Sequence, residues 1–115
     1  MKLYGIPNCN TVKKARTWLT DHSIEVIFHD FKKNGVTKPM LENWCKQVGW
    51  ETLVNRKGTT WRQLPDEIKN NINNESDAIV LMLEKPSVIK RPILEAKQKI
   101  LVGFDEATYA TVCEK

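Results

Sequence analysis

Residues 2–31 read KLYGIPNCNTVKKARTWLTDHSIEVIFHDF, and this stretch decides the fold. A short apolar run over residues 2–6 ends at Pro7 and Asn8, which predicts a strand followed by a tight loop. The next segment, residues 11–21, carries apolar residues at helical spacing: Val12, Ala15, Trp18 and Leu19. Residues 24–31 alternate and predict a second strand, covered on both faces. Since βαβ crossovers are right-handed in nearly all proteins, the two strands should be parallel.

The middle of the chain predicts helices. Thr37 can cap a helix that has Pro39 in its first turn and Gly49 at its end. The apolar residues of this helix form one stripe: Leu41, Trp44, Cys45 and Val48. We expect Cys45 to belong to the core.

Three further segments follow this helix. Residues 55–60 are polar and predict an exposed loop, and residues 65–72 predict a short helix. Residues 78–83 are apolar all round, and a cap at Ser76 or Asp77 favours a buried helix over a strand.

The end of the chain predicts two strands and a helix. The strands cover residues 92–95 and 99–104, and the short polar connection 96–98 makes them an antiparallel hairpin. Asp105 can cap a terminal helix with a shared face of Tyr109, Val112 and Cys113. The order βαβ, helices, ββα predicts one α/β domain over residues 1–115, a mixed four-stranded sheet with a helical insertion at about residues 37–86.

Composition and charge exclude several classes of protein. The chain has 115 residues, 41% hydrophobic and 28% charged, as globular domains do. It has no apolar run of the roughly 20 residues that a membrane span needs, and its start lacks the apolar core of a secretion signal. We therefore expect a soluble, cytoplasmic protein with no membrane partner. The net charge of +4 comes from residues 1–40, which favours a local anion site over direct nucleic-acid binding.

The three cysteines, Cys9, Cys45 and Cys113, include no close pair. An odd number of separated cysteines is typical of thiols in a reducing compartment rather than of a disulfide framework. With His22 and His29 they also fail the spacing of a zinc site, so we expect no metal. We expect no role for Cys113.

Cys9 lies between the first strand and the first helix. Unpaired backbone N–H groups and the positive end of a helix dipole stabilise a thiolate there, and Lys13 and Lys14 add positive charge. A second thiol three residues on is missing, because that residue is Val12. Cys9 is therefore either a reactive thiol, resolved by a small thiol, a partner protein, Cys45 or Cys113, or a small residue that fills the loop.

Arg56 lies in the polar loop and Arg91 precedes Pro92 at the start of a strand. The planar guanidinium group suits oxyanions and carboxylates. By position alone, both residues are more often solvated surface charges.

Residues 4–11 (YGIPNCNT) and 89–93 (IKRPI), with Lys14 and Ala15 between them, resemble the arsenate reductase and Spx family. The nearest part of that family is its YffB-type branch of arsenate-reductase-like proteins. Residues 48–50, 55–62 and 102–104 also fit, so the resemblance covers essentially the whole chain. It implies a thioredoxin-like fold with a helical insertion, and it implies that Pro92 is the cis-proline of that fold.

The resemblance also implies a site. Cys9 matches the nucleophilic cysteine of the family, and Arg56 and Arg91 match two arginines that help to bind an oxyanion. The remaining residues expected to bind substrate are Asn8, Asn10, Thr11, Lys14 and Pro92.

Two departures from the family bear on function. The family's arsenate reductases have a serine where this chain has Val12, and a third arginine near residues 102–104, which read VGF here. We therefore expect a thiol oxidoreductase with a single nucleophilic cysteine and no bound cofactor. Its co-substrate would be glutathione or another small thiol, with a glutaredoxin as a further possible partner. The alternatives are an Spx-like regulator that binds RNA polymerase, and an authentic arsenate reductase.

Overall fold

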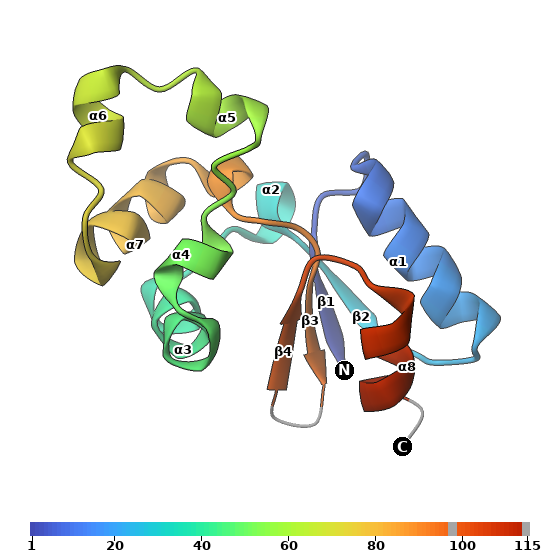
Figure 1. Ribbon diagram of the computed structural model, residues 1–115. Coiled ribbons are helices and arrows are strands. Elements are labelled where there is room, and N and C mark those ends of the chain that lie inside the picture. The colour runs from blue at the N-terminus through green and yellow to red at the C-terminus, as the bar shows by residue number, and fades with distance from the viewer. Residues whose placement is uncertain (97–98, 114–115) are drawn as a thin grey trace. The chain divides into compact units, whose positions relative to one another are not determined.

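The computed structural model describes residues 1–96 and 99–113 (Figure 1). The chain divides into two compact units, which are Met1–Asn34 with Arg91–Lys115, and Gly35–Lys90. The insertion expected at about residues 37–86 falls within the second unit.

The first unit contains a mixed four-stranded sheet. Its strands are β1 (Lys2–Gly5), β2 (Ile27–Asp30), β3 (Ile93–Ala96) and β4 (Lys99–Val102). Their order in the sheet is β2-β1-β3-β4, with β1 parallel to β2 and antiparallel to β3, and with β3 antiparallel to β4. This confirms the predicted sheet and the antiparallel pairing of the last two strands. Residues 97–98 of the expected connection lie outside the described residues.

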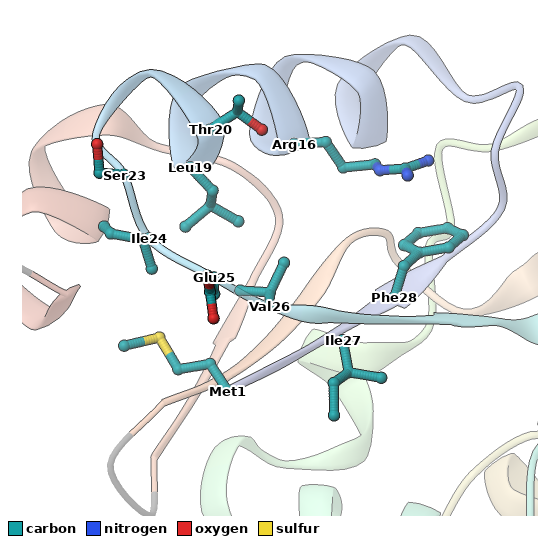
Figure 2. Close-up of a pocket in the computed structure, with 10 residues that line it drawn as sticks. All are labelled: Met1, Arg16, Leu19, Thr20, Ser23, Ile24, Glu25, Val26, Ile27 and Phe28. Carbon is teal, nitrogen blue, oxygen red and sulfur yellow. The ribbon is translucent and has the colours of Figure 1, made fainter.

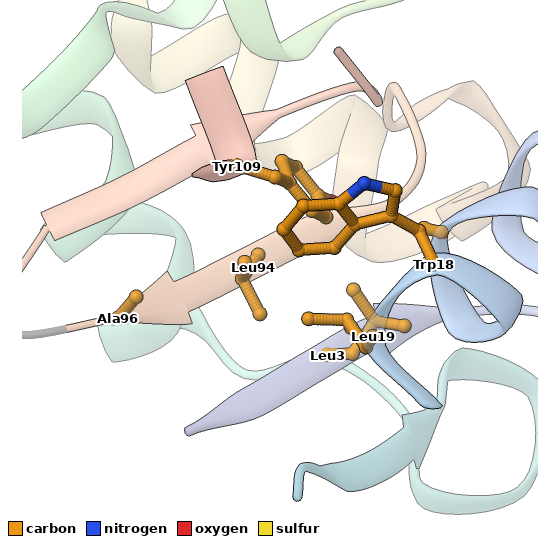
Figure 3. Packing of buried hydrophobic residues seen from close by; sticks show 7 residues of the cluster. Leu3, Trp18, Leu19, Leu94, Ala96 and Tyr109 are labelled. Carbon is orange, nitrogen blue, oxygen red and sulfur yellow. The ribbon is translucent and has the colours of Figure 1, made fainter. Parts of the chain in front are cut away.

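Helices α1 (Asn10–Asp21) and α8 (Glu106–Cys113) cover one face of this sheet (Figure 1). The two helices contact each other through aromatic side chains: Trp18 of α1 packs edge-on against Tyr109 of α8, with 5.7 Å between the ring centroids. Figure 3 shows this pair above Leu3 of β1 and Leu94 of β3. Asp105 caps α8 as predicted, by accepting a hydrogen bond from the Thr108 N–H. The sequence pattern therefore identified the apolar faces of both helices.

The second strand is shorter and more exposed than predicted. It begins at Ile27 rather than at residue 24, because its parallel register pairs Ile27 with Lys2, where β1 itself begins. β2 is also an edge strand, and the Ile27 side chain is 66% exposed. The prediction that both faces are covered was wrong. Helix α2 (Phe31–Asn34) follows at once, and the Asp30 carboxylate accepts the Lys32 N–H in its first turn.

The second unit is helical. Its elements are α3 (Lys38–Val48), α4 (Trp50–Leu53), α5 (Thr59–Arg62), α6 (Asp66–Asn70), α7 (Glu75–Glu84) and the 3-10 helix η1 (Pro86–Val88). Helix α3 begins and ends as predicted, since the Thr37 hydroxyl accepts the Met40 N–H and Gly49 adopts a positive φ of 84°. The buried residues of α3 include Cys45, which confirms its place in the core.

Other parts of the second unit differ from the prediction. The loop expected at residues 55–60 ends earlier, because Thr59 begins α5. The cap of α7 is Asn74, whose side chain accepts the Asp77 N–H, and not Ser76 or Asp77. This helix is also not buried all round, since Val80 is 55% exposed. The neighbouring elements therefore cover only part of the apolar surface of α7.

Candidate active site around Cys9

Cys9 closes a tight loop between β1 and α1. Its N–H donates to the Ile6 carbonyl oxygen at 3.3 Å, and its own carbonyl oxygen accepts the Lys13 N–H at 2.9 Å. The Cys9 backbone is extended (φ −91°, ψ 126°), so this residue is the N-cap of α1. A side chain at the N-cap lies beside backbone N–H groups that have no partner within the helix. The half-exposed thiol therefore occupies the electropositive end of the helix.

Several groups determine the acidity of this thiol. Partial burial raises the pKa of Cys9, but the N–H of Val12, the guanidinium of Arg91 and the N–H of Thr11 together outweigh it. The net effect lowers the pKa of Cys9 below its ordinary value. Thiolate is the nucleophilic form of cysteine, so this environment favours a reactive sulfur.

The topology of the sheet explains how Arg91 reaches Cys9. Strand β3 runs antiparallel to β1 and pairs Ile93 with Tyr4, so the start of β3 lies beside the end of β1, from which the Cys9 loop departs. The Arg91–Pro92 peptide bond is cis, as the family resemblance implied. The Pro92 carbonyl oxygen accepts the Gly103 N–H at 2.8 Å, which ties this turn to the segment after β4. Arg91 is half-buried, and its guanidinium acts on the Cys9 thiol, so it is not a fully solvated surface charge.

The other residues expected near the sulfur lie along the same loop and first turn. The exposed ones are Asn8, Asn10, Thr11, Lys13 and Lys14. Local position predicts that Lys13 and Lys14 supply the charge beside Cys9, whereas the charge that lowers the pKa of Cys9 is that of Arg91, which only the family resemblance places in the site. No local sequence signal could reveal this contact, because 82 positions separate the two residues (91 − 9).

Arg56 belongs to the second unit. Its guanidinium carbon stands 5.3 Å from the ring centroid of Trp50 and 6.0 Å from that of Trp61, at cation–π distances. One of its nitrogens is 3.8 Å from a carboxylate oxygen of Glu51, and both side chains are exposed. A pocket of about 460 Å³ at this loop is also lined by Lys57 and Lys90. The surroundings of Arg56 are thus predominantly cationic and suit a carboxylate or another anion.

The other two cysteines differ from Cys9. Cys45 is buried on α3, and burial, with the charges of Glu75 and Glu42, raises its pKa to about 11. Cys113 is half-buried at the end of α8 and packs against the core of the first unit. Of Cys9 and Cys45, Cys9 is accordingly the thiol whose environment favours nucleophilic chemistry.

A second pocket lies at the outer edge of the first unit, between α1 and the segment that leads into β2 (Figure 2). Its volume is about 730 Å³, and the guanidinium carbon of Arg16 stands 4.3 Å from the Phe28 ring centroid beside it. The described residues that line it include no cysteine. This pocket therefore does not contain the candidate nucleophile.

Among residues 1–96 and 99–113, no three His, Cys, Asp or Glu side chains gather to form a metal site. None of the described helices combines the length and the hydropathy of a membrane span.

The sequence matches the ArsC family over residues 4–112. The chain belongs to this family. It is similar to a solved structure named YFFB protein, with 48% identity, a TM-score of 0.93 and 96% of each chain covered. A protein from Brucella melitensis described as related to arsenate reductase is 47% identical, with a TM-score of 0.76, and the match covers 99% of this chain and 94% of that one.

A more distant relative has a regulatory name. The global transcriptional regulator Spx 1 of Lactococcus lactis is 28% identical over 110 residues, which cover 90% of this chain and 81% of the regulator. These matches confirm the arsenate reductase and Spx resemblance and the thioredoxin-like fold. The chain is an arsenate-reductase-like protein of a family that also includes transcriptional regulators.

Proposed function

We propose that this protein is a thiol–disulfide oxidoreductase that uses Cys9 as its single nucleophile and glutathione as its co-substrate. The observation that carries the proposal is the environment of the Cys9 sulfur, where two backbone N–H groups and Arg91 favour the thiolate. A solvent-accessible thiolate at a helix start is the arrangement that disulfide exchange requires.

The reaction consists of two exchanges. The Cys9 thiolate attacks the glutathione sulfur of a mixed disulfide, RSSG; that S–S bond breaks, and the thiolate RS⁻ leaves and takes up a proton. A glutathione thiolate then attacks the glutathione sulfur bound to Cys9 and releases the Cys9 thiolate together with oxidised glutathione. One RSSG is reduced to RSH and one glutathione is oxidised to the disulfide, so atoms and electrons balance.

The cationic residues would recognise the glutathione carboxylates. These carboxylates lie away from the sulfur, so Arg91 or Lys14 can each meet one of them singly. We assign Asn8, Asn10, Thr11 and Pro92 to the binding of the glutathione backbone. The half-buried position of Arg91 beside the sulfur supports this assignment.

Arsenate makes stronger demands on the same site. A tetrahedral dianion beside a thiolate is repelled by it and needs several fixed donors to offset that repulsion and its lost hydration. Residues 102–104 supply no arginine here. We therefore expect little reduction of arsenate.

A regulatory function is the second candidate, and the 28% identity to the Spx 1 regulator favours it. An Spx-like factor would bind RNA polymerase without any need for catalysis. Co-purification with polymerase that persists in Cys9→Ser would support this function, whereas turnover with glutathione that disappears in the same variant would exclude it as the main activity.

Mass spectrometry after incubation with oxidised glutathione tests the proposal. Trypsin places Cys9 alone in the peptide of residues 3–13, so its adduct is distinguished from adducts at Cys45 and Cys113. We expect one glutathione adduct, on this peptide, and its removal by reduced glutathione. Absence of the adduct contradicts the proposal, and brisk glutathione-coupled arsenate turnover that requires Cys9 would favour arsenate reductase instead.

A further inference from the structure

Gly5 is the last residue of β1, and its missing side chain leaves space for the first turn of α1. A Cβ atom at this position would stand 2.8 Å from Cγ2 and 3.4 Å from Cγ1 of Val12. Real Cβ atoms essentially never come within 3.0 Å of a non-bonded heavy atom outside their own residue and its chain neighbours. Val12 is itself fully buried, so this contact cannot be relieved by turning the side chain into solvent.

Backbone conformation does not explain this glycine. The glycines with a positive φ among the described residues are Gly35, Gly49 and Gly103, and Gly5 is not one of them. Another residue could adopt the Gly5 backbone without strain, so the requirement at this position is space.

The residue seated against Gly5 is also the residue whose N–H contributes most to favouring the thiolate of Cys9. The side chain and the N–H of Val12 belong to one short, hydrogen-bonded helical turn. A displacement of a few tenths of an ångström at the side chain therefore moves the N–H as well. Hydrogen bonds and charge–dipole interactions weaken steeply with such changes in distance and angle.

We propose that Gly5 is a positioning residue for Cys9: by carrying no side chain, it lets Val12 seat the first turn of α1 against β1 and so directs the N–H groups of residues 11 and 12 at the sulfur. This inference rests on the proposed function, in which Cys9 reacts as a thiolate. Gly5 itself does not touch the substrate.

The test is the pH dependence of alkylation at Cys9 in Gly5→Ala, followed on the tryptic peptide of residues 3–13. We expect the midpoint of the rate profile to rise by about one pH unit. Below the midpoint, the rate at a given pH should then be roughly tenfold lower than in the parent. Circular dichroism on the same samples would report whether the fold is retained.

A second substitution should reverse this effect. The Cβ of Val12 stands 3.7 Å from the Cβ position of residue 5, which is an ordinary contact. In Gly5→Ala/Val12→Ala the two close methyl groups are gone, and we expect the midpoint to return to that of the parent. Leu19→Ala is the matched control, because Leu19 is buried on the same helix, about two and a half turns from its start. It should lower the thermal stability without moving the Cys9 midpoint.

The possible results separate this inference from the proposed function. A parental Cys9 midpoint at or above the ordinary value would contradict the proposed function. A lowered parental midpoint that stays unmoved in folded Gly5→Ala would overturn the inference alone. If Gly5→Ala fails to fold, Gly5→Ala/Val12→Ala decides the question: recovery of the fold and of the parental midpoint supports the inference, and failure to recover either overturns it.

Discussion

Cys9 at the start of α1 and Cys45 within α3 carry the same thiol, and burial raises the pKa of both, yet their pKa values move in opposite directions. At Cys9, backbone N–H groups and Arg91 outweigh burial and lower the pKa. At Cys45, the carboxylates of Glu75 and Glu42 add to burial and raise the pKa to about 11. A cysteine in this protein is therefore reactive or inert according to the dipoles and charges around its sulfur, and not according to burial alone.

Removal of one thiol at a time should give the largest difference between the two cysteines. Cys9→Ser should lose all glutathione adduct formation, because serine supplies no thiolate at the helix start. Cys45→Ser should retain it. Intact-mass spectrometry after incubation with oxidised glutathione measures both variants, and an adduct in Cys9→Ser that equals the parental level would show that another cysteine reacts.

Arg91→Ala should reduce the difference in pKa between Cys9 and Cys45 without abolishing it. The variant loses the charge that acts on the Cys9 sulfur but keeps the N–H groups of α1, so the Cys9 pKa should rise. We expect adduct formation near neutral pH to slow roughly tenfold. Arg91→Lys restores a charge without the planar fork and should recover part of the rate, as stopped-flow or quenched mass-spectrometric kinetics would measure. Equal rates in the parent and Arg91→Ala would remove Arg91 from the site.

The raised pKa of Cys45 predicts a loss of stability in alkali. The folded protein keeps this thiol protonated up to about pH 11, whereas the unfolded chain releases the proton near its ordinary pKa of 9.0. Between these values the unfolded chain holds fewer protons, so the free energy of unfolding falls as pH rises, by up to about 1.4 kcal/mol per pH unit. From pH 9 to 11 the free energy of unfolding of Cys45→Ala, measured by urea unfolding, should fall less steeply with pH than that of the parent. Parallel slopes in the two proteins would show that Cys45 has no raised pKa.

At neutral pH the same variant tests the structural role of Cys45. Removing the buried sulfur leaves a small cavity beside Leu41 and Trp44, and we expect a cost on the order of 1 kcal/mol. Thiol chemistry at Cys9 should continue. A variant as stable as the parent but inactive would identify Cys45 as a resolving thiol instead of a core residue.

Local signals in the sequence predicted much of the fold. Thr37 and Gly49 fixed both ends of α3, because capping and positive φ depend on residues within one turn. The apolar spacing of residues 11–21 identified the buried face of α1, and the element order predicted the mixed sheet. The cap of α7 was harder, because Asn74, Ser76 and Asp77 are all good capping residues and lie within one turn.

Features that depend on distant pairing could not be predicted in this way. The length of β2 follows from where β1 begins, and the exposure of Ile27 follows from its edge position. Cys9 was recognised from its place between a strand and a helix, but the contact with Arg91 depends on the antiparallel pairing of β1 with β3. The space that Gly5 leaves for Val12 likewise becomes visible only when the helix is packed on the strand.

Alkylation of the folded protein as a function of pH, resolved by tryptic peptide, measures directly which of the three thiols is the nucleophile. With a pKa of about 11, Cys45 is thiolate at pH 7 in only about one molecule in ten thousand. We predict that the peptide of residues 3–13 is modified first, at least about a hundredfold faster than the peptide that contains Cys45, and with a midpoint below the ordinary cysteine value. If Cys45 or Cys113 reacts first at neutral pH while the protein remains folded, Cys9 is not the nucleophile.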